Sequence, residues 1–538
     1  SDLDKAWEAL RRNDRKQAIE YLTRAINDPQ TATDAFITSV FLKDFEGGKV
    51  SGSFRQMVMD KVPDANPYIF AMWFNDVVLG TYGKKSRNEQ MALLDEIWKR
   101  ADVHGSLKAA ARYVMAHHYL ATNQYEKAQA EWVSMGSINN WQLAGPFDNL
   151  SGSGFYKSYG PLEQAGTQAV FKSMTNAEVK WFTPANLSQE GWTFINSHIP
   201  YPTSISYAQS FVYAPRDMKV LVNTGVNGSL KVWVNDGLVI SESKERVTEL
   251  DYYRAYADLK KGYNRILVQV GVTSNASANF IVRLTDPSGN AIPGLTNKAE
   301  FQNYPKQKTN LELEPVKHFA EAFFEEKIRQ QPDNLVNYLL LSQTYLRNQK
   351  TFEARKLIQA ALKKYPDNSL LRYELMQCLS KEGNRTLLST EIERMKETDP
   401  DCYFVYTLRV NELMDEEKYE EAMEVFKKLS AISTDEQDLI ETKFRLLAAR
   451  EKLEDALKLL QDSYEKYPDN LRIVEMNYNL EKNYYKNQEK AIEIYQEYLK
   501  NNWNFQVYKA VANDYIELGK KEEGQKIMQD IVRMFPYD

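Results

Sequence analysis

The sequence predicts a multidomain protein of the α plus β class, in which an α-solenoid of helical hairpins flanks a jelly-roll β-sandwich. The first observation is a repeat: in the C-terminal part, prolines recur at intervals of 34 or 68 residues, at Pro332, Pro366, Pro400, Pro468 and Pro536. A fixed period of this length is typical of a repeat array. The second observation is that 14 of the 23 glycines lie between residues 136 and 294, where frequent turns indicate β structure.

A chain of 538 residues has room for about three or four domains. We divide it where its composition changes. Residues 1–135 are predicted to form a helical repeat-like domain, residues 136–300 a β-sandwich, and residues 301–538 the repeat array. Only three glycines follow residue 300, which favours helices in that last segment.

The N-terminal segment shows helical periodicity. Trp7 and Leu10 share one helix face, and Ala18, Leu22 and Ala25 share another. The polar sequence Arg-Asn-Asp-Arg between them predicts a turn that joins two antiparallel helices. Residues 117–135 repeat this form, so we expect helical hairpins without a clean period.

The middle segment consists of short runs rich in β-branched and aromatic residues, each bounded by Gly, Asn, Asp or Pro. Asn235-Asp236-Gly237 predicts a hairpin turn between two of these runs. Regularly spaced antiparallel strands imply a sandwich or jelly roll. The predicted strands cover residues 206–214, 219–225, 229–240, 264–271 and 279–286.

The repeats carry the same landmarks in the same phase. In the unit that begins at Leu335, one helix face holds Tyr338, Leu341 and Tyr345. The next helix presents Ala354, Ile358 and Ala361, and its small alanine lets the two helices approach closely. The fifth unit slips by one residue, because Ala491 takes the small position there.

These landmarks resemble the tetratricopeptide repeat, whose pattern has aromatic, leucine, tyrosine and alanine positions and a terminal proline at these spacings. The resemblance covers residues 301–538 and implies six stacked units. Stacked units of this kind form a right-handed superhelix with a concave groove. The resemblance therefore implies that a protein or peptide partner binds in the groove.

Two stretches of the middle segment, LKVWVNDGLVI (230–240) and DLKKGYNRILVQV (258–270), resemble the galactose-binding-like β-sandwich. The resemblance implies a spacer or a glycan-binding module. Exposed tryptophans can stack on sugar rings, and an arginine can donate hydrogen bonds, so Trp192, Trp233 and Arg254 are the candidate ligand-binding residues. Trp233 is the favoured tryptophan because it alternates with inward valines. The alternative is that the tryptophans fill the core and Arg254 forms a surface ion pair.

The order of the segments supplies one more resemblance. Helical repeats, then Trp141 and Gly-Pro-Phe-Asp-Asn (145–149), then a β-sandwich and further repeats, resemble the N-terminal half of large bacterial exported proteins in which a transglutaminase-like domain follows. This resemblance implies a periplasmic or extracellular location. The start at Ser1, without methionine, suggests a trimmed chain. No Cys-His-Asp set matches that catalytic domain, so no catalytic residue is carried over.

Signatures of catalysis are missing from the sequence. It contains no H-E-x-x-H, G-x-S-x-G or phosphate-binding-loop motif. The adjacent His117 and His118 point in different directions on a helix, and Cys378 and Cys402 fit structural positions in the repeats. We therefore predict no catalytic residue, no cofactor and no metal.

Charge and hydropathy exclude two further classes of partner. The net charge is -6, which gives no basic field for nucleic acid, and no apolar run is long enough to span a membrane. The prediction is a non-enzymatic binding or scaffold protein of the bacterial cell envelope. The alternative is a non-catalytic accessory region, with a glycan-binding role, of a transglutaminase-like or carbohydrate-active enzyme.

Overall fold

The computed structural model describes residues 1–46, 50–80, 84–185, 187, 189–275, 277–307, 313–433 and 435–536. The chain packs as two compact units. The helical unit comprises Ser1–Leu93, Phe323–Leu346 and Lys350–Ile531, and the sheet unit comprises Leu94–Ala322, Arg347–Gln349 and Val532–Asp538. The predicted combination of helices with an antiparallel sheet is confirmed. The packing groups the chain differently from the three predicted segments, because residues 1–93 belong with the repeats.

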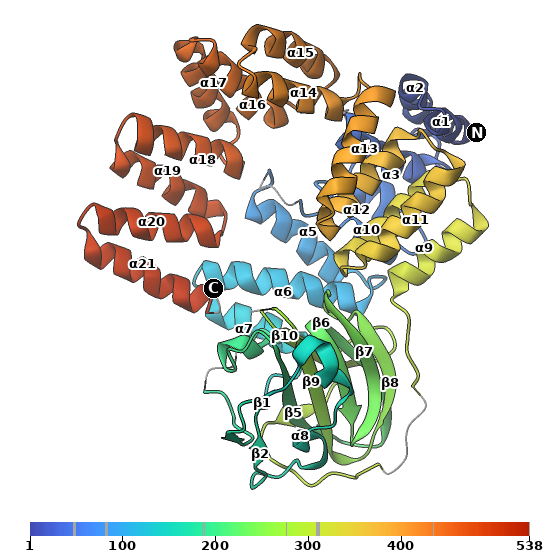
Figure 1. Cartoon of the computed structure of the whole chain (residues 1–538), viewed down its shortest axis with the longest axis vertical. Coiled ribbons are helices and arrows are strands. Elements are labelled where there is room, and N and C mark those ends of the chain that lie inside the picture. The colour runs from blue at the N-terminus through green and yellow to red at the C-terminus, as the bar shows by residue number, and fades with distance from the viewer. Residues whose placement is uncertain are drawn as a thin grey trace. The chain divides into compact units, whose positions relative to one another are not determined.

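Helical hairpins make up the C-terminal part of the helical unit (Figure 1). They follow α9 (Phe319–Gln330), and each consists of a first and a second helix. Among the described residues the pairs are α10 (Leu335–Arg347) with α11 (Thr351–Lys364), α12 (Ser369–Glu382) with α13 (Arg385–Thr398), α14 (Tyr403–Asp415) with α15 (Tyr419–Ile432), α16 (Ile440–Ala449) with α17 (Leu453–Lys466), α18 (Leu471–Asn479) with α19 (Gln488–Asn501), and α20 (Phe505–Glu517) with α21 (Lys521–Met534).

The alanines that the sequence places between paired helices are buried. Ala354, Ala422, Ala456 and Ala491 are fully covered, so the helices approach closely at these positions. The one-residue slip at Ala491 has a structural cause: a π-helical turn, η5 (Leu480–Tyr484), extends α18. A π-helical turn accommodates one extra residue, which restores the phase of the packing.

The N-terminal helices are α1 (Asp2–Arg11), α2 (Arg15–Ala25), α3 (Ala32–Glu46), η1 (Arg55–Met59), α4 (Asn66–Ala71) and the start of α5 (Arg87–Lys99). Trp7, Leu10, Ala18, Leu22 and Ala25 are buried, as the periodicity predicts. Ser1 caps α1 through its hydroxyl, and Asp14 caps α2, which fixes the turn between the two helices. Helix α3 lies against α12 and α14.

The sheet unit begins with α6 (Gly105–Ala121) and α7 (Tyr125–Ser134) and contains a curled antiparallel sheet (Figure 1). In the described residues this sheet has nine strands: β1 (Gln142–Phe147), β4 (Thr193–Phe194), β5 (Ser204–Ala214), β6 (Met218–Val234), β7 (Gly237–Val247), β8 (Tyr253–Leu259), β9 (Gly262–Val272), β10 (Asn279–Thr285) and β11 (Thr296–Lys298). The smaller elements are η2 (Leu150–Tyr156), α8 (Gly160–Glu163), β2 (Phe171–Lys172), β3 (Glu178–Val179) and η3 (Ile195–Ser197).

Strand β6 organises the sheet. Its first half pairs with β8 and β10, and its second half pairs with β7 and β9. The sequence predicts two separate strands here, over residues 219–225 and 229–240. Instead, Gly228 has φ +145° beside a register shift, so the strand bends and continues.

The predicted hairpin at residue 235 is present, with Asn235 and Asp236 both at positive φ between β6 and β7. Asn235 donates from Nδ2 to Asn264 Oδ1 at 2.8 Å and accepts from the Arg265 amide at 2.9 Å. The fully buried Arg265 pairs with Asp236 at 3.1 Å. These bonds join the two stretches that carry the galactose-binding-like resemblance.

Apolar side chains fill the inside of the curled sheet, and Trp141 lies among them. A second buried cluster covers the other face of β5 and β9 and includes Phe147, Phe171 and Trp181. Both faces of the central strands are therefore covered by packed side chains.

A buried ion pair ties the helices of the sheet unit to β10. Arg283 is 2% exposed and pairs with Asp251, which is 1% exposed. Its guanidinium also donates to the carbonyl oxygens of Met135 at 2.7 Å and Gly289 at 3.0 Å. The Ser106 hydroxyl donates to Asp251 at 2.7 Å, so α6, the end of α7 and β10 meet at one charge pair.

Replacing Arg283 by methionine is expected to lower the free energy of unfolding of the sheet unit by about 3–5 kcal/mol, because the Asp251 carboxylate stays buried without its partner. Urea unfolding followed by tryptophan fluorescence measures this. Arg216→Met, at an exposed arginine, is the control and should change stability by less than about 0.5 kcal/mol. Equal stability of the two variants would contradict the structural importance of the pair.

Candidate functional site

One position recurs on the first helix of every hairpin, at intervals of 34 residues. It is occupied by a side-chain amide in five units and by an arginine in the fourth: Gln343, Gln377, Asn411, Arg445, Asn479 and Asn513. Residues in the same register of stacked repeats lie on one face of the array. We define the first-helix face as these six residues together with the residues four and seven positions before each of them.

The first-helix face changes character along the array. In the first two units the positions before the amides Gln343 and Gln377 are apolar or aromatic, and Val336, Leu339 and Leu370 are buried. Tyr373 of the second unit packs against Phe45 of α3, with ring centroids 5.7 Å apart. The chain's own helix α3 therefore lies against this face at the second unit and contacts α14 of the third unit.

From the fourth unit onward the same positions are charged or polar. The residues are Asp438, Glu441 and Arg445 on the fourth unit, Arg472, Glu475 and Asn479 on the fifth, and Gln506, Lys509 and Asn513 on the sixth. All of them are exposed or partly exposed. The sequence contains this apolar-to-charged change, but it is visible only after each unit is read in the 34-residue register.

A pocket of about 490 Å³ lies between the fourth and fifth units. Its lining combines the apolar Leu471, Ile473 and Met476 with the charged Asp438, Glu441, Arg472, Glu475 and Lys84. Arg472 donates two hydrogen bonds to the Glu441 carboxylate, at 2.6 and 2.8 Å. This bidentate contact lowers the pKa of Glu441.

Lys84 closes one side of the pocket. Its ammonium binds the Asp435 carboxylate at 3.0 Å and also pairs with Asp438, and the side chain is only 17% exposed. Burial opposes the charged amine, but the hydrogen bonds and charges of Asp438 and Asp435 outweigh it and raise the pKa of Lys84. Burial raises the pKa of Asp435 as well, yet the bond from Lys84 and its charge lower it overall.

Lys84 belongs to a series of contacts from the N-terminal residues to the loops that precede the first helices. Arg11 donates to the Asp333 carbonyl at 3.0 Å, and Arg15 pairs with both Asp399 and Glu46. The Arg87 amide donates to Asn502 Oδ1 at 3.1 Å, and its guanidinium lies 4.4 Å from the Trp503 ring centroid. We call these the edge contacts; they position the N-terminal residues along the array.

The three residues predicted to bind a ligand lie in the sheet unit and do not form one site. Trp233 is 6% exposed and packs in the cluster with Tyr207 and Phe147, so it offers no free ring face to a sugar. This corrects the expectation of an exposed Trp233: the strand face opposite the valines is itself covered. The alternative of a core-filling tryptophan fits this packing.

Arg254 lies on β8, Trp192 directly precedes β4, and both side chains contact the first half of β6. Arg254 is 6% exposed and donates from Nε to Asn223 Oδ1 at 3.0 Å, so it forms a buried hydrogen bond and no surface ion pair. Trp192 is partly buried against the backbone of β6, where a Cβ at Gly225 would lie 2.7 Å from its ring. Gly225 and Trp233 are eight residues apart, about 26 Å along an extended strand.

The cysteines and His117, which the sequence analysis considered for catalysis or metal binding, lie in packed surroundings. Burial raises the pKa of the Cys378 thiol to about 12 and that of the Cys402 thiol to about 11. His117 lies 3.2 Å from the Glu190 carboxylate. In the part of the chain that the structure describes, no group of three or more His, Cys, Asp and Glu side chains is arranged to hold a metal ion, and no helix has the length and apolarity to cross a bilayer.

Comparison with solved structures finds chains that are similar to part of this protein. No family model and no curated protein matches the chain. A tetratricopeptide repeat protein from Parabacteroides merdae ATCC 43184 aligns with 40% of this chain and 86% of its own length, at 15% sequence identity and a TM-score of 0.31. A TM-score this low does not establish a shared fold.

Replacing Lys84 by methionine is expected to destabilise the helical unit by about 1–2 kcal/mol, between the values for exposed and buried ion pairs. The pKa of Asp435 in the folded chain lies below its ordinary value of 3.8. The contribution of the ionised Asp435 to folding stability is therefore complete well above pH 3.8 and is lost as the pH falls through the folded-state pKa. The difference between variant and parent should therefore shrink between about pH 7 and pH 3.

Urea midpoints at both pH values test this expectation. Lys16→Met, at an exposed lysine of α2, is the matched control and should leave the midpoint nearly unchanged at either pH. A Lys84→Met effect that is the same at both pH values would show that the carboxylates are not its cause.

Replacing Trp233 by alanine is expected to lower the free energy of unfolding by about 3–5 kcal/mol, because it opens a cavity beside Tyr207 and Phe147. Thermal unfolding of the sheet unit measures this. Tyr156→Ala, at a tyrosine that is 76% exposed, serves as the control. Unchanged stability of Trp233→Ala would return Trp233 to the list of surface ligand-binding residues.

Proposed function

We propose that the chain is a non-enzymatic binding or scaffold protein of the bacterial cell envelope. In this proposal the first-helix face of its tetratricopeptide-like array, from α16 to α20, binds an extended segment of a protein partner. The observation that carries the proposal is the change along this face: most of its residues on the first two units are apolar, and its residues from the fourth unit onward are charged or polar and at least partly exposed. A surface that is meant to be filled later by a hydrated peptide must stay soluble without it.

The recurring amides suit an extended peptide. An amide side chain has both a donor and an acceptor, so it can bond to the N–H and C=O of a peptide group whatever the side chain there. Asn513 is exposed and has no hydrogen-bond partner among the described residues, and Asn479 takes part only in a 3.4 Å contact with Asn483. Repetition of such a residue on successive units would hold a peptide at several points.

The pocket between the fourth and fifth units supplies selectivity. Its charges are already paired, Arg472 with Glu441 and Lys84 with Asp438. A partner side chain that enters must replace these bonds with equivalent ones, since an unpaired charge in a desolvated pocket is costly. We therefore expect a polar or charged residue of the partner in this pocket, beside an apolar contact with Ile473 and Met476.

The envelope location rests on the resemblance of the whole arrangement to exported proteins, in which residues 141–149 lead from the helices into the sheet. In this chain those residues form β1 and its exit: Trp141 and Phe147 are buried, and Asn149 donates to the Val272 carbonyl at 2.9 Å. The location is therefore proposed from the resemblance of the whole arrangement, and fractionation of the native host would test it.

Selection of random linear peptides displayed on phage, with the full chain as bait, tests the binding role. Synthetic peptides from the selection should bind the parent, and Asn479→Ala with Asn513→Ala should weaken binding about 30-fold, since a net loss of about 1 kcal/mol at each of the two positions adds to about 2 kcal/mol. Fluorescence anisotropy gives the dissociation constants.

The matched control removes two amides from second helices, Gln461→Ala with Gln525→Ala, and should leave affinity unchanged. Peptides that bind both double variants as tightly as the parent would exclude the first-helix face as their site. Failure of every selected peptide to bind the isolated full chain would exclude the role itself.

A further inference from the structure

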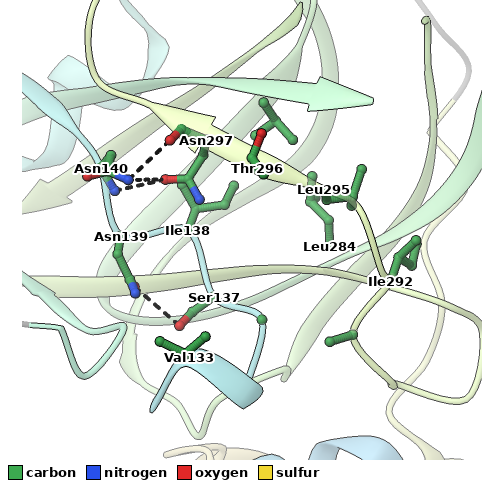
Figure 2. A pocket seen from close by; sticks show the side chains of 13 residues that line it. Val133, Ser137, Ile138, Asn139, Asn140, Leu284, Ile292, Leu295, Thr296 and Asn297 are labelled. Carbon is green, nitrogen blue, oxygen red and sulfur yellow. Dashed lines mark hydrogen bonds between the residues drawn. The ribbon is translucent and has the colours of Figure 1, made fainter. Parts of the chain in front are cut away.

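A second pocket, in the sheet unit, lies beside the end of α7 and the last strand (Figure 2). Its volume is about 340 Å³, at the lower end for small-ligand pockets. The loop from Gly136 to Asn140 forms one side, and the segment from Ala291 to Asn297 forms the other. Val212 and Leu284 of the sheet core form part of the wall.

The lining contains no charged and no aromatic side chain. Seven of its residues are aliphatic: Val133, Ile138, Val212, Leu284, Ala291, Ile292 and Leu295. The polar residues are Ser137, Asn139, Asn140, Thr296 and Asn297, and Gly136 completes the lining. A charged ligand group would lose its water here without gaining a counter-charge, so the lining selects a neutral ligand.

Two asparagines give the pocket its polar end. Asn140 donates from its backbone N–H and from Nδ2 to Asn297 Oδ1, at 3.0 and 2.9 Å, and from Nδ2 to the Asn297 carbonyl at 3.1 Å. Figure 2 shows this pair on one side and Leu284, Leu295 and Ile292 on the other. These bonds fix both side chains, while Asn140 Oδ1 and Asn297 Nδ2 have no partner among the described residues.

We propose that this pocket binds an aliphatic residue of a neutral peptide segment. The residue's side chain would lie against Leu284, Leu295 and Ile292. Its flanking peptide groups would donate to Asn140 Oδ1 and accept from Asn297 Nδ2, which are the one acceptor and one donor that a peptide group requires. The site goes beyond the proposed role of the first-helix face and does not depend on it.

A sugar fits this lining less well. Ring hydroxyls cover all edges of a sugar, and those turned toward the seven aliphatic residues would lose their hydrogen bonds to water without replacement. The lining also has no aromatic ring on which a sugar could stack. A peptide residue separates its apolar side chain from its amides, which matches the two ends of the pocket.

Saturation-transfer difference NMR on the full chain tests the proposal. The probe is N-acetyl-leucine methylamide, which carries one leucine side chain between two neutral amides. We expect saturation of its methyl groups, with a dissociation constant of about 1–10 mM for a ligand of this size. N-acetyl-lysine methylamide and methyl N-acetyl-β-glucosaminide, as the charged and sugar probes, should show no transfer.

Two variants that fill the pocket, Ala291→Trp and Thr296→Trp, should each abolish transfer to the leucine probe; both positions are exposed at the rim. Glu300→Trp places the same ring outside the lining and should preserve it. Circular dichroism melting checks that each variant folds. If one of the two filled variants does not fold, the other still tests the proposal. The proposal is overturned by no transfer to the leucine probe, by stronger transfer to the sugar or lysine probe, or by unchanged transfer in both filled variants.

Discussion

The ion pairs and hydrogen bonds of the edge contacts hold the N-terminal residues against the repeat array. They join residues more than 300 positions apart: Arg15 to Asp399, Lys84 to Asp435 and Arg87 to Asn502. Because they fix the N-terminal residues along the loops before the first helices, α3 can lie against α12 and α14. The apolar residues at the start of the first-helix face are buried, and the charged residues of its continuation are exposed or partly exposed.

This arrangement changes what a repeat array can do. Stacked repeats contact only their neighbours, so an array alone can fray from either end. The edge contacts reach the first, third, fourth and sixth units from the N-terminal residues, and they add long-range restraints to the local packing. A face held in one shape before binding loses less entropy when a partner binds.

The sheet unit depends on buried charges in a different way. Arg265 and Arg283 are almost fully buried, and each is bonded to a carboxylate and to backbone carbonyl oxygens. Arg265 fixes the turn at Asp236, and Arg283 fixes the end of α7 at Met135. The second of these anchors leads directly into the 136–140 loop, which forms the wall of the neutral pocket.

The sequence by itself determined the local elements: the hairpin period from its prolines and alanines, the strands from their β-branched residues, and the turn at Asn235. These depend on interactions between residues close in the chain, which leave a periodic signal. Only the tertiary structure decided that α3 covers the repeats and that Gly228 bends one strand instead of ending it. It also decided that Trp233 and Arg254 are buried. The residues that pack against these side chains are distant in sequence, so no local sequence pattern indicates their burial.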